Sequence, residues 1–378
     1  MWFFRSPEII FGEDSLSFLK DLRINRCLVI TDNFLLKSGL LDKLFRNLPE
    51  SSKRMVIGDI SPEPTFREMT GRIEEIRKFN PDYVIGFGGG SSMDTSKILF
   101  ALNERPDLDV YDITPLVPLG LRKKSRLIAI PTTSGTGSEC SWAAVLSEEG
   151  EKRKSELASP EILPDYAILD PDLVVSLPKE QTKNTAADAL THAIEGYVSS
   201  WNNPFSDAMS EKAIDLISSN IETVLKDPEN IDARNSVHIG ASMAGLSFSN
   251  SQIGLAHALG HSLGAYFKLA HGKTVALFLP NVIDFNYNVS AQKFEKLNSI
   301  VPERYRKKKF SDTLRDLFRS MGVERSIEEC GITRKDFEQN LDGLVSLASE
   351  STGCITNPRQ SSTSDIRELF QKSYARLR

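Results

Sequence analysis

The sequence contains little of what a disulfide-stabilised protein or a cysteine-based metal site needs. It has only four cysteines among 378 residues, and none of them forms a C-x-x-C pair. This spacing argues against a zinc ribbon or a thioredoxin-like redox site, and the low cysteine density argues against a disulfide framework. We therefore expect reduced thiols and a cytoplasmic protein.

An excess of positive charge and long apolar runs are also missing. Lys and Arg number 46 against 51 Asp and Glu, so the formal net charge is -5 and offers no basic footprint for a nucleic acid. No apolar run reaches the length of a membrane span. The first residues, MWFFRSPEII, lack a charged region followed by an apolar core, so we expect no secretory signal. The expected partner is a small molecule, with no contact to nucleic acid or membrane.

The first half of the chain alternates short apolar runs with amphipathic runs. This order predicts a parallel sheet covered by helices, in an α/β domain that extends over residues 1–176. The runs typical of strands lie at residues 27–32, 54–57, 83–87, 127–130, 143–146 and 166–170, and those typical of helices lie at residues 34–45, 65–79 and 90–102.

The pattern of apolar residues changes after Pro178. Runs with helical periodicity follow one another and alternating β-branched runs nearly vanish, so residues 177–378 are expected to form an all-helical domain. The clearest of these runs lie at residues 179–200, 207–225, 233–249 and 255–267.

Histidine is scarce, yet four of the five histidines fall in one part of the helical half: His192, His257, His261 and His271. Asp188 and His192 are four residues apart and therefore project from the same face of one helix. His257 and His261 have the same spacing on a later helix. A carboxylate with three imidazoles suits a borderline divalent ion such as Fe(II) or Zn(II), whereas calcium and magnesium prefer oxygen ligands.

A plainer interpretation of the same residues exists. An Asp-x-x-x-His pair alone is usually a hydrogen-bonded surface pair, and His257 and His261 alone could be hydrogen-bonded core histidines. The segments around both pairs, residues 186–194 and 254–261, are however apolar. Burying several ionisable groups without partners is costly, and a shared ion would satisfy them together. The pattern therefore favours a metal site.

Two loops rich in glycine and hydroxyl groups follow predicted strands. The first, GGGSSMDTSK at residues 88–97, opens a helix whose bare N-terminal amides can attract phosphate. It departs from the G-x-G-x-x-G fingerprint because Met93 stands at the third glycine position. The second loop, PTTSGTGSE at residues 131–139, could complete a phosphate site. Each loop could instead be an ordinary turn.

Asp32 ends the first predicted strand, where an acidic side chain can bind a ribose 2′-hydroxyl. Its charge would repel a 2′-phosphate, so the residue favours NAD over NADP. Asp is also a common helix cap, so a purely structural role for Asp32 stays open.

Together these segments resemble the iron-containing (group III) alcohol dehydrogenase family. The resemblance spans nearly the whole chain, from SPEIIFG at residues 6–12 to TNPR at residues 356–359. Its most specific motifs are the two loops above, DALTHAIEGYVS from residue 188, GLAHALGHSLGA from residue 254 and HGKTVALFLP from residue 271. The departures from the family pattern, at Ala187 and Lys273, remove none of the expected ligands.

The resemblance implies a Rossmann-like N-terminal domain and an all-helical C-terminal domain, an architecture shared with dehydroquinate synthase. It implies metal ligation by Asp188, His192, His257 and His271. It implies cofactor binding by Asp32, Gly89, Gly90, Ser91, Asp94, Thr132, Thr133, Thr136 and Lys154. His261 takes the position of a histidine near the nicotinamide that could relay a proton, and Phe248 that of a substrate-pocket aromatic.

The expected activity is hydride transfer between NAD(P) and a small alcohol or aldehyde, with Fe(II), or alternatively Zn(II), acting on the substrate oxygen. A homodimer or larger homo-oligomer is expected from the resemblance. Two other interpretations stay open at this point: a lyase or cyclase on the same scaffold, similar to dehydroquinate synthase, and a non-catalytic metal- or nucleotide-binding protein.

Overall fold

The computed structural model describes residues 3–61, 64–147 and 154–375, except for the side chain of Lys154. The chain divides into two compact units, with the boundary between Ser176 and Leu177. Phe3 and Phe4 group with the second unit, although we expected them in the first. The reason is local packing, because the ring of Phe4 contacts that of Phe205 with 5.6 Å between centroids.

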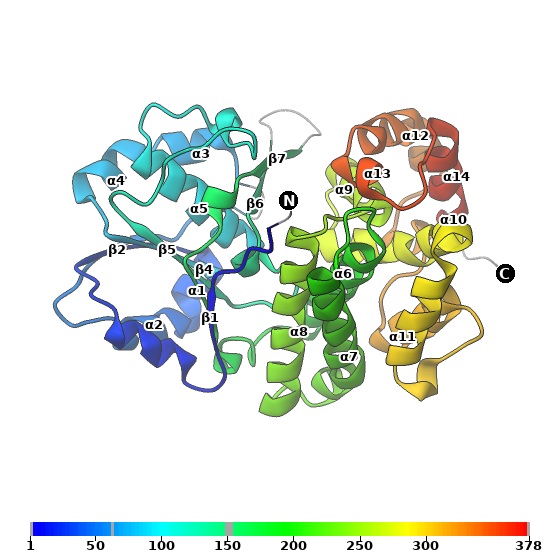
Figure 1. Cartoon of the computed structure of the whole chain (residues 1–378), viewed down its shortest axis with the longest axis horizontal. Coiled ribbons are helices and arrows are strands. Elements are labelled where there is room, and N and C mark those ends of the chain that lie inside the picture. The colour runs from blue at the N-terminus through cyan, green and yellow to red at the C-terminus, as the bar shows by residue number, and fades with distance from the viewer. Residues whose placement is uncertain (1–2, 62–63, 148–153, 376–378) are drawn as a thin grey trace. The chain divides into compact units, whose positions relative to one another are not determined.

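The first unit is built on a six-stranded sheet with the strand order β1-β8-β5-β4-β2-β3 (Figure 1). Within this six-stranded sheet, all the strand pairings of the described residues are parallel, which confirms the predicted sheet. The strands are β1 (Glu8–Phe11), β2 (Arg26–Ile30), β3 (Lys53–Ile57), β4 (Tyr83–Gly88), β5 (Arg126–Pro131) and β8 (Tyr166–Leu169). Strands β6 (Ala143–Ser147) and β7 (Lys154–Ala158) form a separate antiparallel pair.

Both faces of this sheet are buried, because alternate residues of β2 belong to different cores. Leu28 and Ile30 pack under α3 (Phe66–Thr70), α4 (Ile73–Phe79) and α5 (Gly90–Glu104). Cys27 and Val29 pack against α1 (Asn33–Ser38), α2 (Leu40–Asn47) and the 3-10 turn Ser15–Asp21. Figure 1 shows these two helix groups on opposite sides of the strands. A strand buried on both faces needs apolar residues throughout, which explains why its sequence, RCLVI, does not alternate.

Two of the predicted helices are each split into two. The run at residues 34–45 forms α1 (Asn33–Ser38) and α2 (Leu40–Asn47), because Gly39 between them adopts a left-handed φ of 80°. As a result Leu36, expected on the buried face, is 44% exposed. The run at residues 65–79 forms α3 (Phe66–Thr70) and α4 (Ile73–Phe79), with the break at Gly71.

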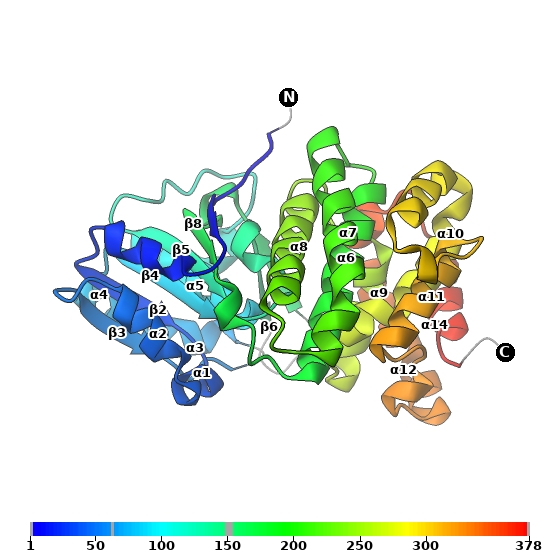
Figure 2. The ribbon, with the colours of Figure 1, turned by 90° about the horizontal axis from the view of Figure 1, so that it is seen from below.

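The second unit is helical, as predicted, and its described residues include no strand (Figure 2). None of the described helices is both long enough and apolar enough to cross a membrane. The helices are α6 (Lys179–Val198), α7 (Pro204–Lys226), α8 (Ile231–Ser249), α9 (Leu255–Phe267), α10 (His271–Ile300), α11 (Phe310–Met321), α12 (Arg334–Ser349), α13 (Thr352–Thr356) and α14 (Thr363–Lys372).

Two glycines allow α10 to approach its neighbours closely. A Cβ on Gly272 would clash with the backbone carbonyl of Asn184 and lie 3.1 Å from the Cβ of Asp188, both on α6. A Cβ on Gly260 of α9 would lie 2.7 Å from the Cα of Val275. The first turn of α10 is therefore held against α6 and α9.

We predict that Gly272→Ala lowers the free energy of unfolding by about 1–3 kcal/mol, because the added methyl group must push α10 away from α6. Gly264→Ala is the matched control, since its Cβ would meet its neighbours only at 3.5 Å or more. That helix-interior change should be neutral or stabilising. Urea unfolding of both variants measures the difference, and equal stabilities would contradict the close approach.

Candidate functional site

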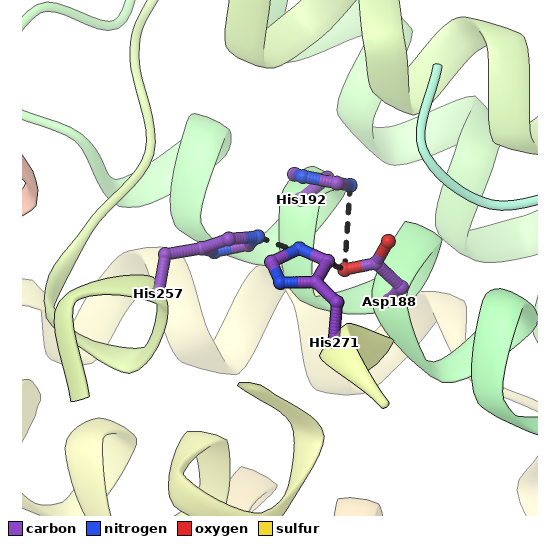
Figure 3. A group of neighbouring side chains, drawn as sticks. All are labelled: Asp188, His192, His257 and His271. Atoms are coloured by element: carbon purple, nitrogen blue, oxygen red, sulfur yellow. Dashed lines mark ion pairs between the residues drawn. The ribbon is translucent and has the colours of Figure 1, made fainter. Parts of the chain in front are cut away.

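Four side chains from three helices of the second unit converge on one point (Figure 3). Asp188 and His192 project from α6, His257 from α9, and His271 is the first residue of α10. One potential ligand atom from each lies within 4.8 Å of the others. The structure thus brings together all four residues that the sequence suggested as metal ligands.

The spacing of these atoms suits a shared ion better than direct hydrogen bonds. Asp188 Oδ1 lies 3.9 Å from His192 Nδ1, 3.7 Å from His257 Nε2 and 3.4 Å from His271 Nε2. Two ligands bound at about 2.1 Å in a tetrahedral shell are about 3.4 Å apart. Asp188 Oδ1, His192 Nδ1 and His257 Nε2 are also buried, and none of them has a hydrogen-bond partner among the described residues. A divalent cation would satisfy all three at once.

The charges around the four residues favour a cation. Burial opposes ionisation of Asp188, yet His192 and His271 hold the pKa of its carboxyl well below the usual range. Burial lowers the pKa of His192 to about 3. Burial acts in the same direction on His257, but Glu195 and Asp188 outweigh it and raise the pKa of that ring to about 9. Positive charge, as a proton or as a metal ion, is therefore stabilised here.

Glu195 is a residue of this site that the sequence analysis missed. Its Oε2 lies 2.5 Å from His257 Nδ1, on the side of the ring opposite Asp188. Glu195 follows Asp188 by seven residues and His192 by three, so all three share one face of α6. That spacing was the available signal for this residue.

His261 and Phe248 both lie beside the four residues. The His261 ring is 4.9 Å from that of His271 and 5.7 Å from that of His257, measured between centroids. The Phe248 ring stacks on His192 at 4.3 Å with 21° between the planes. Phe248 thus packs against His192, a contact that its expected place in a substrate pocket did not indicate.

The two glycine-rich loops meet at the carboxyl ends of adjacent strands in the first unit. Gly88 of β4 pairs with Pro131 of β5, and Thr132 N donates to Gly88 O at 3.0 Å. Gly89 precedes the first turn of α5 and offers no side-chain cap. Bare amides at a helix N-terminus form a site for phosphate. Among the expected cofactor residues, Ser91, Thr133 and Thr136 are partly exposed around this turn, whereas Thr132 is buried.

Asp94 has a structural role that the sequence did not reveal. Its Oδ1 accepts from Ser138 Oγ at 2.5 Å and its Oδ2 from Val145 N at 3.0 Å, so it ties α5 to the second loop and to β6. The buried Lys97 lies 3.5 Å from the same carboxylate and donates to Ser138 and Ser141. Both carboxylate oxygens are engaged, and direct contact of Asp94 with a cofactor stays a prediction.

Asp32 is a helix cap, as its plainer interpretation stated. Its Oδ1 accepts from Phe34 N at 2.8 Å and from Leu35 N at 3.0 Å. Both bonds use Oδ1, so capping does not occupy Oδ2. Lys154 begins β7, but its side chain is not among the described parts of the chain, so the cofactor contact expected of it stays a prediction.

Comparisons with known proteins agree with this arrangement. Residues 6–171 match the family model described as iron-containing alcohol dehydrogenase, and residues 182–374 match that of the Fe-containing alcohol dehydrogenase family, C-terminal. The chain belongs to the iron-containing alcohol dehydrogenase family. This confirms the resemblance seen in the sequence.

Individual members of the iron-containing alcohol dehydrogenase family match along the whole chain. The NADPH-dependent butanol dehydrogenase of Clostridium saccharobutylicum is 32% identical over 97% of this chain and 96% of its own length. The aldehyde-alcohol dehydrogenase of Streptococcus pneumoniae is 30% identical over 99% of this chain, which spans only 46% of that longer protein. The solved structure of an iron-containing alcohol dehydrogenase from Thermococcus thioreducens has a TM-score of 0.90, 30% identity and 99% coverage of both chains.

We predict that Gly89→Ala weakens NADH or NADPH binding about tenfold while changing stability by at most about 1 kcal/mol. The protein itself has room for the methyl group, whose nearest neighbour would be Thr133 at 3.6 Å. The methyl group would instead occupy space that a phosphate needs at the N-terminus of α5. Calorimetric titration and thermal melting measure the two effects separately.

Gly90→Ala is the contrasting variant, because its Cβ would lie 2.9 Å from the Thr136 side chain and would displace the second loop. It should lose both stability and cofactor affinity. Unchanged cofactor binding in Gly89→Ala would show that this glycine forms only a turn.

Proposed function

We propose that this chain is a metal-dependent alcohol dehydrogenase that transfers a hydride between NAD(P) and a small alcohol or aldehyde. The observation that carries the proposal is the convergence of four potential ligand atoms, three of them buried without a hydrogen-bond partner, in a chain of the iron-containing alcohol dehydrogenase family. The helical unit is proposed as the metal-binding domain and the α/β unit as the cofactor-binding domain.

Asp188, His192, His257 and His271 would hold the ion. The family favours Fe(II), and the same donors also accept Zn(II). When bound, the ion supplies a Lewis acid for the oxygen of an alcohol or carbonyl. The phenyl ring of Phe248, stacked on His192, offers an apolar surface next to the ligands. This apolar surface favours the proposal that the substrate carries a small alkyl group. The names of relatives such as the butanol dehydrogenase favour the same proposal.

Hydride transfer needs a nicotinamide, because no protein side chain accepts a hydride. The N-terminus of α5, which has no side-chain cap, and the hydroxyls of Thr133 and Thr136 are proposed to bind its pyrophosphate. Ser91, Thr132, Lys154 and Asp94 stay predicted cofactor residues.

His261, with its ring 4.9 Å from His271, is proposed to carry a proton between the substrate and water, since imidazole titrates near neutral pH. A cytoplasmic location and a homo-oligomeric state stay predictions.

We predict that His257→Ala loses bound metal and dehydrogenase activity together, because three ligands hold an ion much more weakly than four. His261→Ala is the matched control, an imidazole on the same helix outside the proposed ligand set. It should keep its metal and lose activity only. Metal analysis and NADH absorbance with a panel of short alcohols give both readings. Full metal occupancy in His257→Ala would disprove the ligand assignment.

For the cofactor, we predict a preference for NAD over NADP, set by the negative charge of Asp32. Asp32→Asn keeps a cap oxygen for Phe34 N and Leu35 N but removes the charge that repels a 2′-phosphate. The ratio of kcat/KM with NADP to that with NAD should rise about tenfold or more, equivalent to about 1.4 kcal/mol.

The control for this comparison is Asp42→Asn, which changes the same charge at an exposed position of α2 and should leave the ratio unchanged. The comparison is needed because the butanol dehydrogenase relative is named as NADPH-dependent. A native enzyme that prefers NADP would show that Asp32 does not set the choice.

A further inference from the structure

We propose that Glu195 is a positioning residue that fixes His257 in the one tautomer able to bind a metal through Nε2. The inference rests on the proposed metal centre and extends it to a group that touches no ion. Glu195 is only 3% exposed, and its carboxylate lies between α6, which carries it, and the first turn of α9.

Both carboxylate oxygens of Glu195 accept hydrogen bonds from the start of α9. Oε2 accepts from Gly254 N at 3.0 Å and lies 2.5 Å from His257 Nδ1, and Oε1 accepts from Ala256 N at 2.5 Å. The negative charge also lies at the positive end of the α9 dipole, where it is stabilised. Glu195 thus holds the backbone and the ring of the same helical turn.

This contact decides which nitrogen of His257 can serve as a ligand. A carboxylate accepts only, so Nδ1 must carry the hydrogen and the lone pair of a neutral ring is left on Nε2. Nε2 is the atom that faces Asp188 Oδ1 at 3.7 Å, buried and without a hydrogen-bond partner. A carboxylate on the far nitrogen also makes the ring a stronger donor.

A glutamine in this position cannot reproduce these contacts. With its oxygen at Oε2, its amide would face the N–H of Ala256, donor against donor. With its oxygen at Oε1, its amide would face Gly254 N and would force Nδ1 of His257 to become the acceptor. The hydrogen would then move to Nε2, and that atom could no longer bind a metal.

The backbone of Gly254 shows how closely the carboxylate is held. A Cβ on Gly254 would lie 2.9 Å from Glu195 Oε1 and 3.1 Å from its Cδ. The φ of Gly254 is -129°, which any residue adopts, so the glycine is required here for space and not for backbone conformation. Gly254→Ala should therefore displace the carboxylate of Glu195 without changing its chemical identity.

The test is the affinity of the full-length, metal-stripped protein for Zn(II), measured by competition with a chromophoric chelator, and the absorption spectrum of its Co(II) form. Glu195→Gln should bind Zn(II) about 10- to 100-fold more weakly than the native protein. Gly254→Ala should show a smaller loss in the same direction. The His257→Ala variant gives the level of Zn(II) binding elsewhere on the protein, outside the proposed metal centre.

Glu104→Gln is the matched control for loss of a buried carboxylate. Glu104 is 5% exposed and accepts from the backbone N–H groups of Lys123, Lys124 and Ser125 in the α/β unit. It should lose stability but keep the native Zn(II) affinity and Co(II) spectrum. Thermal melting of every variant separates loss of folding from loss of metal.

Native affinity and an unchanged Co(II) spectrum in folded Glu195→Gln, or in Gly254→Ala if the first variant does not fold, would overturn the inference. A native protein that binds Zn(II) at this centre but turns over no alcohol would refute the proposed function, and weaker binding in Glu195→Gln would still support the role of Glu195. A native protein that binds no more Zn(II) than His257→Ala would refute both.

Discussion

The burial of the Asp188 carboxylate among three imidazoles is the interaction around which the helical unit is organised. Asp188 is 2% exposed, and positive charge beside it would offset the cost of holding its carboxylate so far from water. The neighbours that supply or attract this charge come from α6, α9 and α10, so these helices must approach closely. Gly260 and Gly272 allow that approach, because a side chain at either position would clash with the neighbouring helix.

Two other buried charged groups, Lys97 and Glu104, are satisfied by hydrogen bonds within the protein. Lys97 is fully buried, and its ammonium group donates to Ser138, Ser141 and the Ala143 carbonyl at 2.6 to 3.1 Å. Glu104 accepts three backbone N–H groups. The unpartnered atoms of Asp188, His192 and His257 contrast with both cases. These three atoms are the ones that the proposed cation would satisfy.

Much of this arrangement could be predicted from periodicity and spacing. The strands buried on both faces and the helical second half follow from local patterns, as does the shared helix face of Asp188 and His192. The choice of His257 and His271 over His261 as the other ligand candidates came from the family resemblance. What the patterns could not show depends on backbone geometry and tertiary contact. The left-handed Gly39 splits a helix that its leucines suggest is continuous. The bond from Glu195 to His257 joins residues 62 positions apart, and the engagement of Asp94 with Val145 joins residues 51 apart.

The proposed function depends on one ion shared by Asp188, His192, His257 and His271. The most direct measurement is anomalous X-ray scattering at the iron and zinc edges from crystals of the protein grown without chelator. We expect one strong peak, about 2.0–2.3 Å from one atom of each of the four side chains. Density for water alone at hydrogen-bonding distance from these atoms, or a peak bound by other residues, would contradict it.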